Sequence, residues 1–351
     1  MTALLLPPAA ILACAPVGEG AGIELGRSRE GRVLRGFVFG SGARRVSLIG
    51  GCHADEPVGP WLLRRLAAYL DHLPPAHPLL TQAHWTLVPH ANPDGEARNR
   101  AWSEPEGAAP PLDAGFDPLL YLRHASRELP GDDIEFGFPR ESGDVEARPE
   151  NRAVAAFLRA HGPFELHASL HGMAYAGGPW FLLDEAWSAR SEPFQAELRA
   201  LTEALGYRLH DVQRHGEKGF VRIARGFCTR PNHLAMQAHF RARNDPEMAA
   251  RFRPSSMEFV RALGGDALTL VSEMPLFTVE GLGDRIEPSD PAAERLRGTV
   301  LPRVQSLLLK DEPAARAALA EGGVRAMPIG EQMRLQLGMI EAGLRLVSAG
   351  S

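Results

Sequence analysis

The hydrophobic positions of this chain follow two periods in turn, one typical of strands and one typical of helices. Apolar residues alternate with others over 33–39 and run continuously over 46–49, so we expect a hairpin that feeds a central strand. Over 61–70 they recur at helical spacing, which predicts an amphipathic helix. The segment 50–57 between that strand and that helix is therefore a short loop held at both ends.

The alternation of strand and helix continues along the chain. The pattern predicts further strands at 84–89, 164–170, 178–183 and 268–273, the third beside the second. It predicts a turn at 92–95 and helices that begin at 149, span 192–205 and follow 288. This order indicates an α/β fold with helices on both faces of one sheet. We assign residues 1–25 to an N-terminal segment and 26–351 to one domain.

Charge and composition exclude several classes of partner. The chain of 351 residues has a net charge of -5 and no dense tract of lysine and arginine, so we expect neither nucleic acid nor an anionic membrane surface as a partner. Its three cysteines form no Cys-x-x-Cys pair, which argues against a disulfide framework and against a thiolate metal site. The pattern carries no signal for an oligomeric state.

The first residues resemble a secretion signal only weakly. Leu4–Leu6 and Ala9–Cys14 are apolar, but no lysine or arginine precedes Arg27, and two prolines interrupt the run. We therefore expect a cytoplasmic protein, with export or lipid attachment at Cys14 as the alternative.

Two histidines and a glutamate near predicted strand ends could bind a metal ion. His53 and Glu56 share the loop 50–57, and an imidazole and a carboxylate three residues apart can converge on one cation such as zinc. His171 follows another predicted strand and could complete a set that leaves one position open for water. Each residue alone would more often be structural. His167, four residues earlier, is not expected to face the same site.

Glu273 ends the apolar strand 268–273. A carboxylate in such a place is costly to bury unless it is paired or functional. Beside a metal site it could take a proton from water and deliver it to a leaving amine. Without a metal nearby, a helix cap or a surface acid would be the better interpretation.

In their order and spacing, these motifs resemble the zinc carboxypeptidases of the carboxypeptidase A type, from about Gly26 to Pro275. The matching segments are Gly26–Arg32, Gly51–Glu56, Asn92–Gly95, Asn99–Trp102, Pro149–Val154, Ser169–Gly172 and Leu270–Glu273. The resemblance implies a single α/β domain with a central mixed, twisted sheet, one zinc ion, and hydrolysis of an amide bond in peptides or modified amino acids.

The resemblance also implies roles for single residues. The zinc ligands would be His53, Glu56 and His171. Glu273 would be the general base and acid, and Asp133 would orient the first histidine. Arg100 would hold the developing oxyanion, because a fixed guanidinium needs no reorganisation there. Arg98 is the alternative, since the gap after the Asn-Pro-Asp-Gly motif is shorter than in the family.

The segment 131–139 departs from the family where the substrate is bound. It resembles the family's Gly-Val-Asp-Leu-Asn-Arg-Asn-Phe-Pro, in which Asn-Arg grips the free carboxylate of a peptide, but Glu135 and Phe136 stand at those positions. An acid and an aromatic reverse the local charge preference. We expect both to contact substrate, with Arg98 as a further candidate. C-terminal recognition is then lost, replaced by binding of a cation beside Glu135, or rebuilt with an arginine from 222–230.

The leading hypothesis is therefore a zinc metallopeptidase, a metallocarboxypeptidase-like hydrolase acting on peptides or acylated amino acids. The rival enzyme is a deacylase of the aspartoacylase and succinylglutamate desuccinylase kind, which acts on N-acyl amino acids and begins with a similar Gly-x-His-x-x-Glu. Residues 133–139 favour the carboxypeptidase side. A third hypothesis, an inactive binding protein on the same fold, is disfavoured because the ligand set and Glu273 are all intact.

Overall fold

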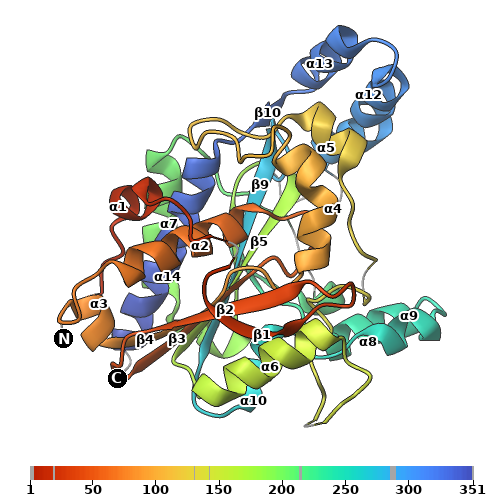
Figure 1. Ribbon diagram of the computed structural model, residues 1–351. Coiled ribbons are helices and arrows are strands. Elements are labelled where there is room, and N and C mark those ends of the chain that lie inside the picture. The colour runs from red at the N-terminus through yellow and green to blue at the C-terminus, as the bar shows by residue number, and fades with distance from the viewer. Residues whose placement is uncertain are drawn as a thin grey trace.

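Within residues 4–18, 20–129, 131–141, 143–212, 216–284 and 290–349, which the computed structural model describes, ten strands form one mixed sheet (Figure 1). The order is β1-β2-β4-β3-β5-β9-β6-β8-β7, and β10 pairs with β9. The strands are β1 (Ile23–Arg27), β2 (Val33–Phe39), β3 (Arg44–Gly50), β4 (Ala83–Val88), β5 (Leu166–Ala176), β6 (Trp180–Leu183), β7 (Arg222–Ala224), β8 (Phe227–Thr229), β9 (Leu268–Val279) and β10 (Val324–Ala326).

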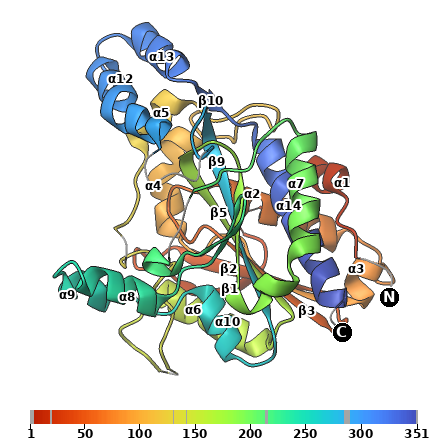
Figure 2. The same cartoon turned by 180° about the vertical axis from the view of Figure 1, so that it is seen from behind.

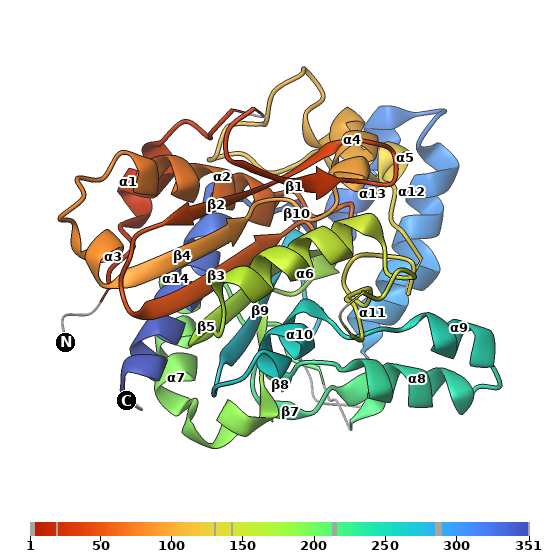
Figure 3. The ribbon, with the colours of Figure 1, turned by 60° about the horizontal axis from the view of Figure 1, so that its bottom comes forward.

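Helices cover both faces of this sheet, which confirms the predicted α/β fold. Helices α2, α7 and α14 lie on one face (Figure 2), and α6 and α10 lie on the other (Figure 3). The helices are α1 (Pro8–Ala13), α2 (Val58–Asp71), α3 (Pro78–Thr81), α4 (Pro93–Ser103), α5 (Pro118–His124), α6 (Pro149–His161), α7 (Glu192–Ala204), α8 (His233–Arg241), α9 (Pro246–Arg251), α10 (Ser256–Ala262), α11 (Pro291–Arg295), α12 (Leu301–Leu307), α13 (Glu312–Glu321) and α14 (Ile329–Ala349). Short 3-10 turns η1 (Glu185–Arg190) and η2 (Glu217–Gly219) and a π-helical turn η3 (Leu296–Val300) complete the described elements.

The central strands β3, β5 and β9 are parallel and buried on both faces. Their side chains alternate between two cores: Leu48 packs in the large core on the side of α2 and α14, and Ile49 in the smaller core on the side of α6. This explains why the strands read as continuous apolar runs. Loops that leave parallel strands at their carboxyl ends meet along one edge of the sheet, where ligands bind in α/β proteins.

Two strand neighbours differ from the prediction. β2 forms its hairpin with β1, and β4 lies between β2 and β3, so residues 33–39 and 46–49 are not paired. β6 pairs with β9 and not with β5. The apolar runs predict strands but do not specify their partners. Parallel neighbours are joined by long crossovers such as α2, which let a later strand enter the sheet between earlier ones.

The motif Asn92–Gly95, predicted as a turn, begins helix α4. The side chain of Asn92 accepts a hydrogen bond from the N–H of Gly95 at 3.0 Å, and Pro93 occupies the first helical position. The motif is thus a helix start, a context in which the same residue types are favoured as in turns.

The N-terminal segment packs into the domain. Leu4, Leu6 and Ile11 are buried in the large core, and α1 lies against α2 and α14. β1 begins at Ile23, three residues before the boundary expected at Gly26. Among the described helices, none combines the length and the apolar character that a membrane span requires.

His167 is a core histidine. It shares a face of β5 with His171, contrary to our expectation, because four residues are an even number of strand steps. It lies about 13 Å further back along the strand, however. Its Nδ1 is 2.7 Å from Ser47 Oγ and its Nε2 is 3.0 Å from Ser256 Oγ. Burial lowers the pKa of His167 to about 3.

This low pKa predicts a pH-dependent contribution to stability. Below pH 6.5 the unfolded chain binds a proton at His167 and the folded chain does not, so the residue disfavours folding by about 1.4 kcal/mol per pH unit down to its folded pKa. Glutamine has no such titration. The difference in unfolding free energy between wild type and His167→Gln should therefore become smaller by about 1.4 kcal/mol for each unit by which the pH is lowered from 6 to 4. Urea denaturation of both proteins at several pH values measures it, and a difference independent of pH would contradict the prediction.

Candidate metal and catalytic site

His53 and Glu56 lie in a tight loop between β3 and α2. Gly51 has φ 65°, and a Cβ atom there would lie 2.3 Å from the ring of His90, so the loop needs glycine at this point. Gly59 in α2 similarly passes close to Leu170 of β5. These close approaches bring the loop against the strand that carries the second histidine.

His171 and Glu273 are direct neighbours on β5 and β9. Both strands continue past the predicted ends, to Ala176 and Val279, so these residues lie within strands. In adjacent parallel strands, paired positions face the same side. The register therefore places the imidazole and the carboxylate next to each other over the loop that carries His53.

Three side chains converge where this loop meets β5. The Nδ1 atoms of His53 and His171 are 3.2 Å apart. Glu56 Oε1 lies 2.7 Å from His53 Nδ1, and Glu56 Oε2 lies 3.0 Å from His171 Nδ1. Glu56 and His171 are buried, and Glu56 Oε2 has no hydrogen-bond donor within the described part of the chain.

Mutual attraction sets the charges of this cluster. Burial disfavours the charged forms, but the carboxylate of Glu56 outweighs it and raises the pKa of His53. His171, next to Glu135 as well as Glu56, has a pKa well above its usual range despite its burial. In turn, the two histidines hold the pKa of Glu56 well below its usual range. Glu56 is therefore ionised at neutral pH.

The pKa of Glu273 is shifted in the opposite direction to that of Glu56. Burial raises the pKa of Glu273 to about 8, and the nearby carboxylate of Glu56 adds to the increase, while His171, His53 and Arg127 lower it. A carboxyl group with a pKa near neutrality can both accept and release a proton at physiological pH. Such shifts are common among acids and bases at active sites.

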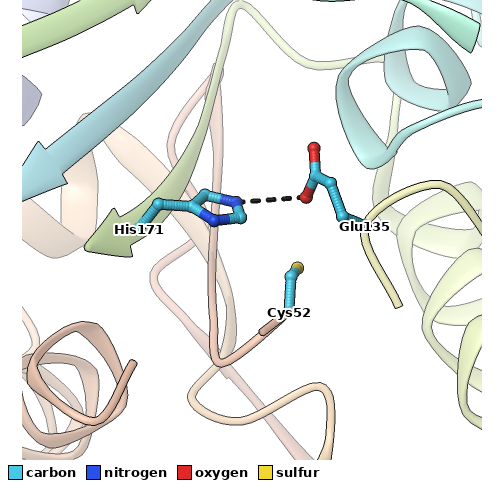
Figure 4. A group of neighbouring side chains, drawn as sticks. All are labelled: Cys52, Glu135 and His171. Carbon is cyan, nitrogen blue, oxygen red and sulfur yellow. Dashed lines mark ion pairs between the residues drawn. The ribbon is translucent and has the colours of Figure 1, made fainter. Parts of the chain in front are cut away.

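The other ring nitrogen of His171 faces a second set of side chains (Figure 4). Its Nε2 is 2.8 Å from Ser169 Oγ and 3.1 Å from Glu135 Oε2. Cys52 lies beside them on the loop that carries His53, and burial raises the pKa of its thiol to about 11. The carboxylate of Glu135 can accept the hydrogen on Nε2, an arrangement that orients the ring with Nδ1 toward Glu56 and His53.

Arg127 reaches the same cluster from the segment after α5. Its Nη2 is 3.0 Å from His53 Nδ1 and 3.3 Å from Glu56 Oε1, and its Nη1 is 3.6 Å from Asp55 Oδ1. Asn99 of α4 holds this segment in place through two hydrogen bonds with the backbone of Ser126, at 2.8 and 2.9 Å. The amide of Asn99 also donates to the carbonyl of Ala54, in the loop that carries His53, at 2.9 Å.

A cavity of about 200 Å³ opens over these residues. Its polar side includes His53, His171, Glu273, Arg127 and Glu135. Its remaining wall is largely apolar, with Phe136, Phe252, Met236, Leu182, Met257 and Val271. The cavity thus combines a reactive polar centre with room for an apolar group.

The zinc carboxypeptidase family model matches residues 22–216, more than half of the chain. The chain belongs to the zinc carboxypeptidase family. The match confirms the resemblance inferred from the order of the motifs.

Several solved carboxypeptidase structures are similar to this chain. They include a metallo-carboxypeptidase from Burkholderia cenocepacia, with 17% identity over 98% of this chain and 68% of that chain and a TM-score of 0.42. Carboxypeptidase A from Helicoverpa armigera has 11% identity over 94% and 68%, with a TM-score of 0.46. A metallo-carboxypeptidase from Pseudomonas aeruginosa, in complex with (2-guanidinoethylmercapto)succinic acid, has 18% identity over 96% and 66%, with a TM-score of 0.44. The search of curated proteins gave no match.

The converging residues fit the zinc ion of this family. Ligands about 2.0–2.1 Å from a tetrahedral zinc ion lie about 3.3 Å from one another, close to the 3.2 Å between the two Nδ1 atoms and the 3.0 Å from His171 Nδ1 to Glu56 Oε2. Two imidazoles and a carboxylate are a donor set that zinc prefers. Glu56 Oε2 is buried and accepts no hydrogen bond within the described part of the chain, and a bound cation would satisfy such an atom.

Asp133, expected to orient His53, is not within hydrogen-bond distance of it. Its Oδ2 is 3.9 Å from His53 Nε2, and its Oδ1 accepts a hydrogen bond from the N–H of Phe136.

The structure does not bring Arg100 or Arg98 to this zinc carboxypeptidase site. Arg100 lines a separate cavity, of about 500 Å³, with His90 and Glu96. Arg98 donates to Glu128 at 3.3 Å and to the carbonyl of Asp94. Both lie on α4, whereas the arginine at the cluster is Arg127. The short gap after the Asn-Pro-Asp-Gly motif signalled a shift of register, but the alternative that we expected from it was Arg98.

The segment 131–139, in which we expected Glu135 and Phe136 to contact substrate, also differs from that expectation. Glu135 is buried against His171, and Phe136 packs edge to face with Phe252 in the apolar wall, with ring centroids 5.5 Å apart. Three arginines in the region 222–230 pair with acids elsewhere: Arg222 with Asp211, Arg225 with Asp284 and Arg230 with Asp184. Among the described residues that line the cavity over His53 and His171, none of these three arginines is present.

Proposed function

We propose that this protein is a zinc-dependent hydrolase that cleaves an amide bond in peptides or acylated amino acids. The observation that carries the proposal is the convergence of His53, Glu56 and His171, at 2.7–3.2 Å, next to Glu273 in one cavity. A bound zinc ion would supply Lewis-acid polarisation of the scissile carbonyl and a lowered pKa for water. Membership of the zinc carboxypeptidase family supports the same reaction class.

The chain's own residues would then divide the work. Glu273 would take a proton from the attacking water and give it to the leaving nitrogen, for which a pKa near neutrality is suited. Arg127 would donate hydrogen bonds to the oxyanion that develops on the carbonyl oxygen. Asp55 and Glu56 hold its guanidinium at the cavity, so little reorganisation is needed.

Glu135 would act as a positioning residue on His171 and not as a substrate ligand. Its carboxylate is nearly buried and lies 3.1 Å from the Nε2 atom of that histidine. Partners of this kind fix the tautomer and orientation of a metal-binding histidine and increase its basicity.

This role predicts a selective loss of metal affinity. Glu135→Gln should weaken zinc binding by about 10–100-fold, because the charged partner of His171 is lost while the side chain keeps its shape. Competitive titration with a zinc chelator measures the change. Glu128→Gln is the matched control, since Glu128 lines the same cavity but pairs with Arg98 and Arg148. Equal zinc affinities for wild type and Glu135→Gln would contradict the role.

The deacylase hypothesis keeps the same chemistry and differs in substrate. An apolar wall and the absence of the family's Asn-Arg pair are compatible with acylated amino acids as well as peptides. The binding-protein hypothesis is less well supported, because Glu273, a partly buried carboxyl group with no hydrogen bond or ion pair to another described residue, would only destabilise the fold if it had no function.

Product profiling by mass spectrometry tests the proposed function. Zinc-loaded wild type is incubated with a pool of free peptides, amidated peptides and N-acyl amino acids, and the chelated protein serves as the blank. Zinc-dependent cleavage of an amide bond is expected, and the cleaved class separates peptidase from deacylase. A protein that binds zinc and leaves the whole pool unchanged would support the binding-protein hypothesis.

A further inference from the structure

Apart from Glu273, the acids of the cavity over the proposed zinc ligands already have partners. Glu128 accepts a hydrogen bond from Asn92 at 2.6 Å and pairs with Arg148 at 3.1 Å. Glu135 lies against His171, and Asp133 accepts from the backbone and faces His53. These carboxylates are engaged within the protein, so they offer little attraction to a cationic substrate.

The two cations of the cavity differ in how they are held. Arg127 is committed to Asp55 and Glu56. Lys218 lines the same cavity, and within the described part of the chain it makes no ion pair or hydrogen bond. It is one of only two lysines in the sequence. Its ammonium, on a cavity-lining residue with no ion pair to another described residue, is a candidate site for an anion.

The backbone at Lys218 supports a role beyond structure. Its φ is 56° and its ψ is 14°, in the left-handed region that costs energy for a residue with a side chain. It stands in a turn with two glycines of positive φ, Gly216 and Gly219. A third glycine would be easier to accommodate here, so this lysine occupies a strained position at the edge of a cavity, a location where strain is often functional.

The wall beside Lys218 indicates what accompanies the anion. Phe220, two residues further, lines the cavity together with Phe136, Phe252, Met236 and Met257. An ammonium next to an aromatic and methionine surface suits a ligand with a negative group and a bulky apolar group close together.

We propose that Lys218 binds a carboxylate of the substrate and that the adjoining apolar wall takes the side chain next to that carboxylate. The inference rests on the proposed function, because it uses the same cavity. Lys218 would thus be a specificity-determining residue that lies outside 131–139 and outside 222–230, the two segments where the sequence suggested a carboxylate binder. It would favour substrates with a free carboxylate over their amides.

Ligand binding tests this without depending on turnover. 3-Phenylpropanoate and 3-phenylpropanamide, which differ only in the negative charge, are titrated calorimetrically into zinc-loaded and zinc-free wild type. We expect the acid to bind about 10–100-fold more tightly in both forms. Lys218→Met should abolish the preference, and Lys218→Arg should retain most of it. Lys310→Met, at the exposed second lysine, should behave as wild type.

The outcomes separate the two proposals. Equal binding of acid and amide by wild type, or a preference unchanged in Lys218→Met, would overturn the role of Lys218. A preference seen only with zinc and unaffected by Lys218→Met would mean that the metal holds the carboxylate, which also overturns it. Charge-selective binding that needs Lys218, in a protein that cleaves nothing in the mixed pool, would support Lys218 and contradict the proposed hydrolase function.

Discussion

Glu273→Gln should lower kcat by about 10³-fold, within the 10²–10⁴ range of general acid–base catalysis, and should leave zinc content unchanged. Glutamine keeps the shape of the side chain but cannot accept a proton from water. The fold should tolerate it, because burial raises the pKa of Glu273 to about 8 and the native site already accommodates a neutral group near pH 7. Single-turnover kinetics and metal analysis of the same sample measure both quantities.

The matched control for this change is Glu280→Gln. Glu280 follows the same strand, is exposed and lies beyond the end of β9, so its replacement should leave kcat within about twofold of wild type. A Glu273→Gln protein that keeps its zinc and most of its turnover would contradict the assignment of Glu273 as the proton carrier.

Arg127→Met should lower kcat/KM by about 10²–10³-fold, with the effect mainly on kcat. The guanidinium would be lost where negative charge develops, and removal of one oxyanion donor typically has this size of effect. Arg100→Met is the matched control, because Arg100 lies in a different cavity, and we expect a change of less than about threefold. Steady-state kinetics of both variants on one cleaved substrate compares them directly.

The reverse result would restore the assignment made from the sequence. If Arg100→Met were the damaging change and Arg127→Met the harmless one, the oxyanion role would belong to α4, and the contacts of Arg127 with His53 and Glu56 would be structural. Equal small effects for both variants would remove arginine from the mechanism.

The zinc-ligand candidates were accessible to sequence analysis because local rules govern them. His53 and Glu56 are close in sequence and lie on one loop, so their spacing alone brings them near each other. His171 and Glu273 follow apolar runs that form neighbouring parallel strands, and parallel strands align their carboxyl ends. The order of the motifs therefore predicted the fold family as well as a set of residues that the structure brings together.

Arg127 could not be found in this way, because long-range contacts place it. Asn99 binds the backbone at Ser126 and at Ala54, and so joins the segment that carries Arg127 to the loop that carries His53. The motif around Asn99 was recognised from its sequence, but its neighbour Arg100 received the role. In this protein the motif contributes the side-chain amide of Asn99, which holds the backbone next to Arg127.

Glu135 illustrates a second limit of sequence reasoning. A glutamate at this position showed that the family's carboxylate-binding pair is altered. It did not show in which direction the side chain of Glu135 points. Packing turns it toward His171, and the remaining cation of the cavity comes from Lys218, on a turn for which the sequence offered no clear pattern. The predicted strand partners of β2 and β6 were wrong for a similar reason, since apolar runs do not encode pairing.

The central claim is that His53, Glu56 and His171 form one zinc site on which hydrolysis depends. Zinc titration of the metal-free protein, monitored by calorimetry and followed by a hydrolysis assay, tests it most directly. Wild type and His167→Gln, changed four residues earlier on the same strand, should each bind one zinc ion and be active, whereas His171→Ala should lose both properties. A His171→Ala protein that stays fully active without zinc would contradict the account.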